Sequence, residues 1–265
     1  MIVLLSACNH MHPSIPKEAG TLSAESLADV YLAASPDTFV GLYALSRNAF
    51  GDDDTPCPIV TSDEVGDYLV AQGCTDRWGT TWHGTMNRLD HEGIAEYSDF
   101  GPEFDDWRGA AHYLVDGKVE WSYPDTSNTS DVRVDTDVVV TWKGAGEDVL
   151  VYVGGTGRHK SAGPLLRERD GDIGVADWGT AEVSHGEIFT AGTKGCNQAI
   201  EGLVEVFAAN DAEIQLPNGD GCASSPGDEP SPTDCATWAI GQEDGELCIG
   251  TRMLIVPTDA DAPTD

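Results

Sequence analysis

Basic residues are scarce in this chain. Lys and Arg total 14 against 46 for Asp and Glu, which gives a formal net charge of −32 over 265 residues. An excess of negative charge this large repels phosphate backbones and anionic lipid headgroups, so nucleic acid is excluded as a partner. The acidic residues are spread along the whole chain. This pattern favours a solvated acidic coat over a site that gathers one cation.

Long hydrophobic runs and catalytic motifs are also missing. No stretch after residue 8 approaches the roughly 18 apolar residues of a spanning helix, so we expect no helix to cross a membrane in the mature chain. The nucleophile motif G-x-S-x-G does not occur. The zinc motif H-E-x-x-H begins at His91-Glu92, but Ala95 stands where the second histidine would be. The sequence therefore identifies no catalytic residue and no cofactor.

The cysteines divide into one plus six, and no C-x-x-C pair occurs among them. The absence of that spacing argues against a zinc ribbon and a thioredoxin-like site. An even set in an exported chain indicates disulfides, with 15 possible connectivities. Apart from Cys8, the six are Cys57, Cys74, Cys196, Cys222, Cys235 and Cys248.

The first eight residues have the order of residue types that ends a secretory signal. An apolar start ends in Leu5-Ser6-Ala7-Cys8, which resembles the lipobox of bacterial lipoproteins. The resemblance implies cleavage before Cys8, lipid on its sulfur and export, and Asn9 then favours the outer membrane. The apolar run is shorter than the usual 7–15 residues of a signal. Two explanations of the short run stay open: the true start lies upstream, or the match to a lipobox is accidental and Ile2 begins a buried strand.

The rest of the chain is expected to be mainly β, an antiparallel meander, sandwich or barrel with a short N-terminal helical pair. The expected organisation is a signal remnant over 1–7, a flexible tether over 8–22, a helical segment over 23–51, a disulfide-stapled β domain over 52–256 and an acidic tail over 257–265.

The helical segment begins at Ser23, a plausible N-cap with Leu22 and Leu27 at the spacing of a hydrophobic staple. Ser35-Pro36-Asp37 ends this helix and begins a second one. We expect the pair to cover one edge or end of the β domain.

Strand-like runs and turn dipeptides follow from Cys57 onward. The predicted strands include 132–142, 149–153, 202–207 and 212–216, which are rich in β-branched residues. The Asp-Gly and Asn-Gly dipeptides, which favour tight hairpin turns, include Asp116-Gly117, Asp170-Gly171, Asn218-Gly219 and Asp244-Gly245. Because no helical pattern separates the strands, they should pair antiparallel.

These hairpins bear on how the six cysteines pair. A turn centred on Val65-Gly66 places Cys57 opposite Cys74, where sulfurs can meet. A two-residue turn at Asp244-Gly245 would place Gly241, not Cys235, opposite Cys248. Cys235 is therefore assigned to Cys222, and Cys196 to Cys248, as one choice among several.

A second resemblance rests on three segments: Cys57-Pro58-Ile59-Val60-Thr61, Gly73-Cys74-Thr75 and Gly79-Thr80-Thr81-Trp82-His83-Gly84. Together with late cysteines near Asp-Gly dipeptides, they are similar to a pattern in uncharacterised bacterial lipoproteins. The match covers about 30 residues. It implies an exported β protein and adds no catalytic residue.

Two candidate sites stand out, each with a simpler alternative. Asp170, Asp172 and Asp177 resemble part of a calcium loop, although Gly174 interrupts the ligand order and no closing Glu follows. Trp78, Trp82, Trp107 and Trp121 could form a platform that stacks sugars or peptides, or they could fill a β core, which is the commoner role.

The sequence thus predicts a lipid-anchored cell-envelope protein with a structural or binding role. Its expected partners are the membrane, through the lipid, and an envelope protein or polysaccharide. The alternative is an exported hydrolase of polysaccharide or peptide. Such an enzyme would use two carboxylates at a set separation, which 46 acids make impossible to recognise from sequence.

Overall fold

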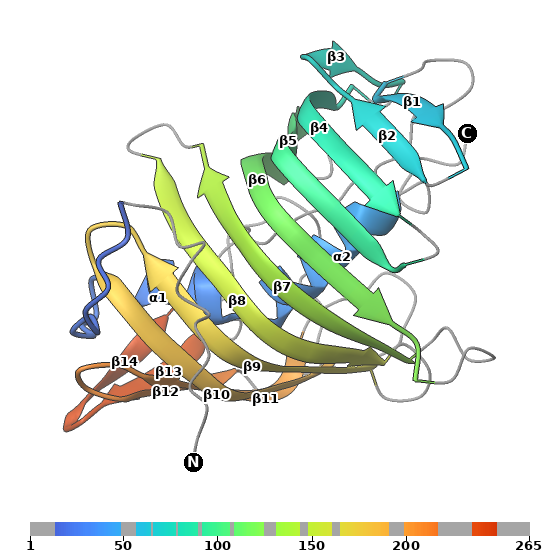
Figure 1. Ribbon diagram of the computed structural model, residues 1–265. Coiled ribbons are helices and arrows are strands. Elements are labelled where there is room, and N and C mark those ends of the chain that lie inside the picture. Colours follow the sequence, from blue (N-terminus) through green and yellow to red (C-terminus); the bar gives the residue numbers. More distant parts are fainter. Residues whose placement is uncertain are drawn as a thin grey trace.

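A single antiparallel sheet curls around two helices (Figure 1). The computed structural model describes residues 14–48, 57–64, 66–77, 79–89, 92–106, 109–124, 131–143, 148–160, 165–190, 199–216 and 235–247. Across these ranges, no helix combines the length and apolar content that a membrane-spanning helix needs.

The strands follow one another in the sheet almost in chain order, and only β3, which pairs with β4, lies off the path from β1 to β14. The strands are β1 (Ile59–Ser62), β2 (Asp67–Val70), β3 (Cys74–Thr75), β4 (Thr81–Leu89), β5 (Ile94–Asp106), β6 (Gly109–Ser122), β7 (Asp131–Trp142), β8 (Val149–Lys160), β9 (Leu165–Val175), β10 (Gly179–Thr190), β11 (Ala199–Phe207), β12 (Ala212–Leu216), β13 (Ala236–Ile240) and β14 (Glu243–Leu247). The mainly β prediction is confirmed. Of the three predicted architectures, the sheet is the meander, and it stays open.

The helices α1 (Leu27–Ala34) and α2 (Pro36–Asn48) lie against the inner face of the curled sheet. The N-cap of the first is Ser26, so the prediction of Ser23 is wrong; Ser23 lies one turn earlier, and its hydroxyl accepts the backbone N–H of Ser26 at 3.3 Å. Leu22 and Leu27 are both buried. The predicted role at an edge or end is wrong, since both helices contribute to the central core. The first helix is apolar apart from Asp29, and its buried residues are Leu27, Val30, Tyr31, Leu32, Ala33 and Ala34.

The core forms between these helices and alternate residues of the strands. On β7, for example, Val132, Val134, Val138 and Val140 point inward and are buried. This period of two is what leaves one face of an antiparallel sheet for the core and one for solvent. One continuous cluster extends from α1 to β14, so the helical segment and the strands form one structural unit.

The N-terminal segment is packed rather than free. Ile15 lies on the outer face of the sheet against Val139 and Tyr152, and all three are buried. Farther on, Gly20 donates its N–H to the carbonyl of Thr180 at 3.0 Å. The tether prediction over 8–22 is therefore wrong for residues 14–22, while residues 8–13 lie outside the described ranges.

Several turn predictions are also wrong. Asp116-Gly117 lies inside β6, Asp170-Gly171 inside β9 and Asp244-Gly245 inside β14. The tight turn between β13 and β14 is Gly241-Gln242 instead, because Ile240 pairs with Glu243. Asn218-Gly219 lies outside the described ranges.

Candidate functional site

The disulfide between Cys57 and Cys74 is present, with the two Cα atoms 5.7 Å apart. The pairing is confirmed, but the register that predicted it is wrong. Ser62 pairs with Asp67, which centres the turn one residue earlier than expected. Cys74 belongs to β3, which pairs with β4, so the chain has already left the β1–β2 ladder before it reaches Cys74.

A second disulfide involves Cys235, which is bonded and buried. Its partner lies outside the described residues, where Cys196, Cys222 and Cys248 also lie. Cys8, the predicted site of the lipid, lies outside them as well. The argument that kept Cys235 away from Cys248 depended on a turn at Asp244-Gly245, and that turn does not form.

The tryptophan platform does not form on the outer face. Trp82 and Trp121 are buried in the core, only 3% and 5% exposed, and Trp82 stacks on Phe100 with ring centroids 5.6 Å apart. Trp78 and Trp107 lie outside the described residues. The alternative role as core residues is the one that Trp82 and Trp121 adopt.

The predicted calcium ligands do not converge. Asp170 and Asp172 lie on β9, Asp177 lies in the following turn, and all three are exposed. In the described part of the chain, the group of three His, Cys, Asp or Glu side chains close enough to hold a metal ion is His83, Glu103 and His112. Sequence analysis missed this group because its members come from three different strands.

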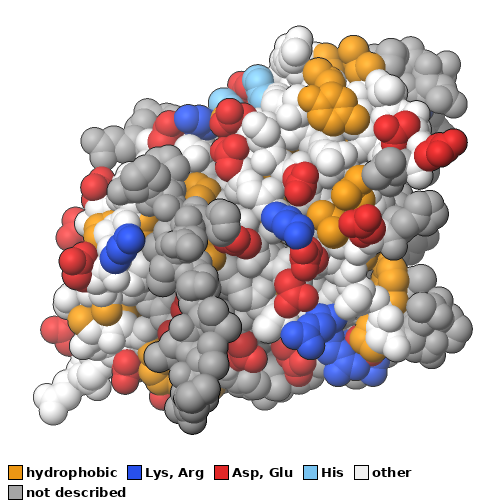
Figure 2. All heavy atoms as spheres, viewed as in Figure 1, with side chains coloured by type: hydrophobic (Ala, Val, Ile, Leu, Met, Phe, Trp, Pro, Cys, Tyr) orange, Lys and Arg blue, Asp and Glu red, His pale blue; other side chains and the backbone are white. Residues whose placement is uncertain are grey.

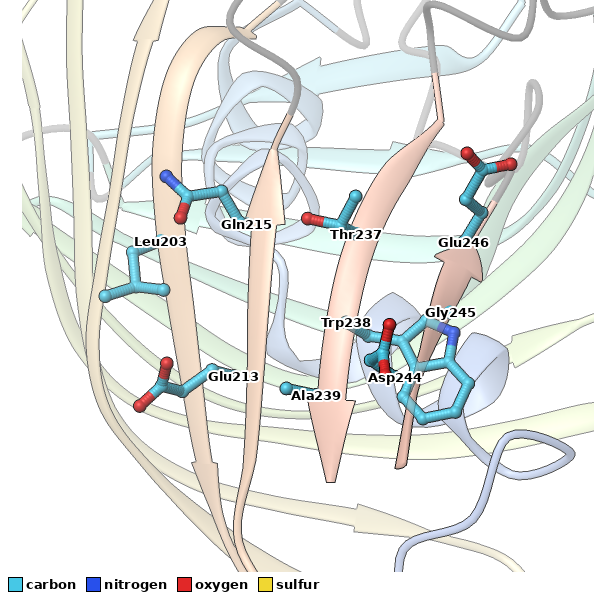
Figure 3. Close-up of a pocket in the computed structure, with 9 residues that line it drawn as sticks. All are labelled: Leu203, Glu213, Gln215, Thr237, Trp238, Ala239, Asp244, Gly245 and Glu246. Carbon is cyan, nitrogen blue, oxygen red and sulfur yellow. The ribbon is translucent and has the colours of Figure 1, made fainter. Parts of the chain in front are cut away.

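A hollow of about 430 Å³ lies on the outer face of β11 to β14 (Figure 3). Its floor is β13, where Thr237 and Ala239 present small side chains. The neighbouring strands form the walls through Glu213 on β12 and through Asp244 and Glu246 on β14. The remaining lining residues are Leu203, Gln215, Trp238 and Gly245.

Strand register sets the order of these side chains in two rows. Ala239 pairs with Glu213 on one side and Asp244 on the other. Thr237 pairs likewise with Gln215 and Glu246. Each row therefore has a small residue in the middle and at least one carboxylate at its side, and the hollow is the space that the small residues leave.

The packing beneath the hollow keeps β13 and β14 close together. Trp238 shares the inward side of β13 with Ala236 and Ile240 and packs against the core. Its indole lies over Gly245, where a Cβ atom would come within 2.7 Å of the ring. A side chain at position 245 would displace the indole, so the glycine is needed for this pairing.

The carboxylates of Glu213, Asp244 and Glu246 are exposed, and within the described ranges no salt bridge neutralises them. Neighbouring strands lie about 4.8 Å apart, so the backbones of β12 and β14, which carry these carboxylates, are about 9–10 Å apart. A single cationic group placed over β13 can therefore interact with both walls.

Comparison with known proteins adds no relative: no family model, curated protein or solved structure matches this chain.

Proposed function

We propose that this protein is an exported envelope protein, anchored by lipid on Cys8, whose hollow on β11–β14 binds a basic segment of a partner protein. The observation that carries the binding role is the hollow itself, with small residues on its floor and carboxylates on both walls.

Disulfides support the export part of this proposal. Cys57 is bonded to Cys74, and Cys235 is bonded as well. Disulfides persist in oxidising compartments and are rare where thiols are kept reduced. The lipobox-like Leu5-Ser6-Ala7-Cys8 supports the membrane anchor.

The chemistry of the hollow favours a lysine or arginine side chain as the bound group. Thr237 and Ala239 leave room for an aliphatic stem, and Leu203 adds an apolar contact at one side. The cationic head can then lie between Glu213 and Asp244. Long basic side chains bury their stems on such surfaces while their charge stays near carboxylates.

A basic peptide such as hexalysine tests this binding role by calorimetry on the purified protein at low ionic strength. The double variant Glu213→Gln/Asp244→Asn should weaken binding by about tenfold, which corresponds to about 1.4 kcal/mol. The reason is that it removes one carboxylate from each wall.

The matched control is Glu96→Gln/Glu182→Gln, which changes exposed residues on β5 and β10. Both double variants change the formal charge from −32 to −30, so both reduce the general attraction of the acidic coat equally. If the two variants weaken binding by the same factor, the peptide is held by overall charge and the proposed site is wrong.

A further inference from the structure

Two imidazoles and a carboxylate meet on the outer face of β4, β5 and β6, several strands away from the hollow. The Nε2 atom of His83 lies 3.0 Å from Oε2 of Glu103, and Nε2 of His112 lies 3.8 Å from the same oxygen. The candidate ligand atoms of all three residues lie within 4.8 Å of one another. Histidine side chains are visible beside acidic ones over this part of the sheet (Figure 2).

Strand register explains why these side chains converge. Glu103 on β5 pairs directly with His112 on β6. His83 on β4 pairs with Gly101, two residues before Glu103 and on the same face. Gly101 places no side chain between the two imidazoles, whose rings stack with centroids 5.7 Å apart and planes 24° apart. The three groups therefore lie around one point above β5.

Packing in the core fixes the backbone of β4 and β6 next to the two histidines. The residues next to the two histidines, Trp82 and Tyr113, are buried on the inner face. The indole N–H of Trp82 donates to Asp76 at 2.9 Å. At Gly101 a Cβ atom would lie 1.9 Å from the carbonyl oxygen of Tyr113, so β5 and β6 approach very closely there. Side chains that start from such a fixed backbone need little rearrangement to bind an ion.

We propose that His83, Glu103 and His112 bind one divalent transition-metal ion, with zinc as the reference ion. Metal–ligand bonds of about 2.0–2.2 Å in a tetrahedral site place ligand atoms about 3.3–3.5 Å apart. The two separations from Glu103, 3.0 and 3.8 Å, lie on either side of that value. A bound ion would draw the three ligand atoms, which lie within 4.8 Å of one another, to that separation.

The donor set decides the class of ion. Two imidazole nitrogens and one carboxylate oxygen suit zinc, copper, nickel and cobalt, whereas calcium and magnesium prefer oxygen ligands alone. The hydrogen bond between His83 and Glu103 would account for one histidine by itself. His112 lies 3.8 Å from the same carboxylate oxygen, beyond hydrogen-bond distance, and one ion between the three groups would use all of them as ligands.

The ion can reach the site from solvent. The side chains of His83, Glu103 and His112 are 32%, 48% and 35% exposed. The formal charge of −32 raises the concentration of cations near the surface. Three protein ligands leave one tetrahedral position to water or to a group from outside.

The first test is zinc titration by calorimetry. Excess magnesium is present throughout, so that magnesium occupies any sites made of carboxylates alone. Wild-type protein should bind one zinc ion per chain in addition to any weak background. His83→Gln/His112→Gln should weaken that binding by about a hundredfold or remove it, because it deletes two of three ligands. Thermal melting of each variant without metal checks that the fold is intact.

Matched controls remove the same groups elsewhere. Glu96→Gln removes an exposed carboxylate from β5, and His159→Gln removes a half-buried imidazole from β8. Both should bind zinc as the wild type does. Cobalt gives a second readout, since a four-coordinate site produces visible absorption bands that octahedral cobalt in solution produces only weakly. The proposal is overturned if wild type shows no stoichiometric zinc binding, or if the double variant binds zinc as well as the controls do.

Discussion

At the scale of single residues, Arg169 is the least expected feature of the core. It lies on β9, is 1% exposed, and has no carboxylate bonded to it in the described ranges. Its guanidinium donates to the carbonyl of Ala33, near the end of α1, and to the carbonyl of Gly154 at 3.0 Å. Burial lowers its pKa to about 10, so the group stays charged at neutral pH. The negative end of α1 helps to compensate this charge.

We therefore predict that Arg169→Met destabilises the protein by about 2–4 kcal/mol, because methionine fills the space but leaves two buried carbonyls without donors. Arg169→Lys should cost less, since it keeps a charge and can reach one carbonyl. Urea unfolding measures both. As a control, Arg158→Met removes an exposed arginine bonded to Asp131 on the outer face, and it should cost less than about 1 kcal/mol. Equal losses for Arg169→Met and Arg158→Met would contradict the argument.

At the scale of elements, the positions and type of most strands follow from the sequence. The β-branched runs at 132–142 and 212–216 match β7 and β12 closely. The turns are harder to predict from the sequence, because an Asp-Gly dipeptide fits both a hairpin turn and the interior of a bent strand. At Gly117 and Gly171 the φ angles are 117° and 152°, inside long strands. The local preference of glycine for positive φ is the same in a hairpin turn and in a strand that bends, and only the strand pairing decides between them.

The close approach of β8 and β9 shows what these glycines are for. A Cβ atom on Gly155 would lie 2.6 Å from the Cα of Gly171, and one on Gly171 would lie 2.4 Å from the Cα of Gly155. Any side chain at either position would push the two strands apart. The two strands pair on both sides of this contact, at Val153–Ile173 and at Thr156–Asp170. The glycines therefore meet because of strand pairing, which their positions along the sequence do not show.

The β13–β14 hairpin leads to a disulfide prediction. Ala236 pairs with Leu247, so one further step along the ladder reaches Cys235 on one side and sequence position 248, a cysteine, on the other. Residues directly opposite each other in an antiparallel pair can reach disulfide geometry. We expect non-reducing peptide mapping to join Cys235 to Cys248. A peptide that joins Cys235 to Cys222 or Cys196 would show that the ladder does not continue.

At the scale of the whole molecule, the sequence predicts the class of fold but not the places where side chains meet. His83, Glu103 and His112 are separated by 20 and 9 residues along the chain, and no local spacing marks them. Their convergence depends on the register between β4, β5 and β6, which the bulge near Gly84 shifts by one residue. A shift of that size reverses which face a side chain occupies. The hollow is unpredictable for the same reason, since its walls come from β12 and β14.

The short distance along the chain between Cys8 and the packed Ile15 limits how far the proposed lipid anchor can lie from the sheet. Ile15 is fixed on the outer face of the sheet, so only residues 9 to 13 separate Cys8 from the first described residue. Each residue spans at most about 3.6 Å, and a lipid on Cys8 would therefore hold this face close to the membrane. Expressed with an export signal, the wild type should partition into detergent, and Cys8→Ser should stay in the aqueous phase because it lacks the sulfur to which we propose the lipid is attached. Since Cys8→Ser leaves Ile15 and the sheet unchanged, its urea unfolding should match that of the unlipidated wild type. Equal partitioning of the two proteins would contradict the lipid anchor while leaving the hollow and the histidine cluster to be tested independently.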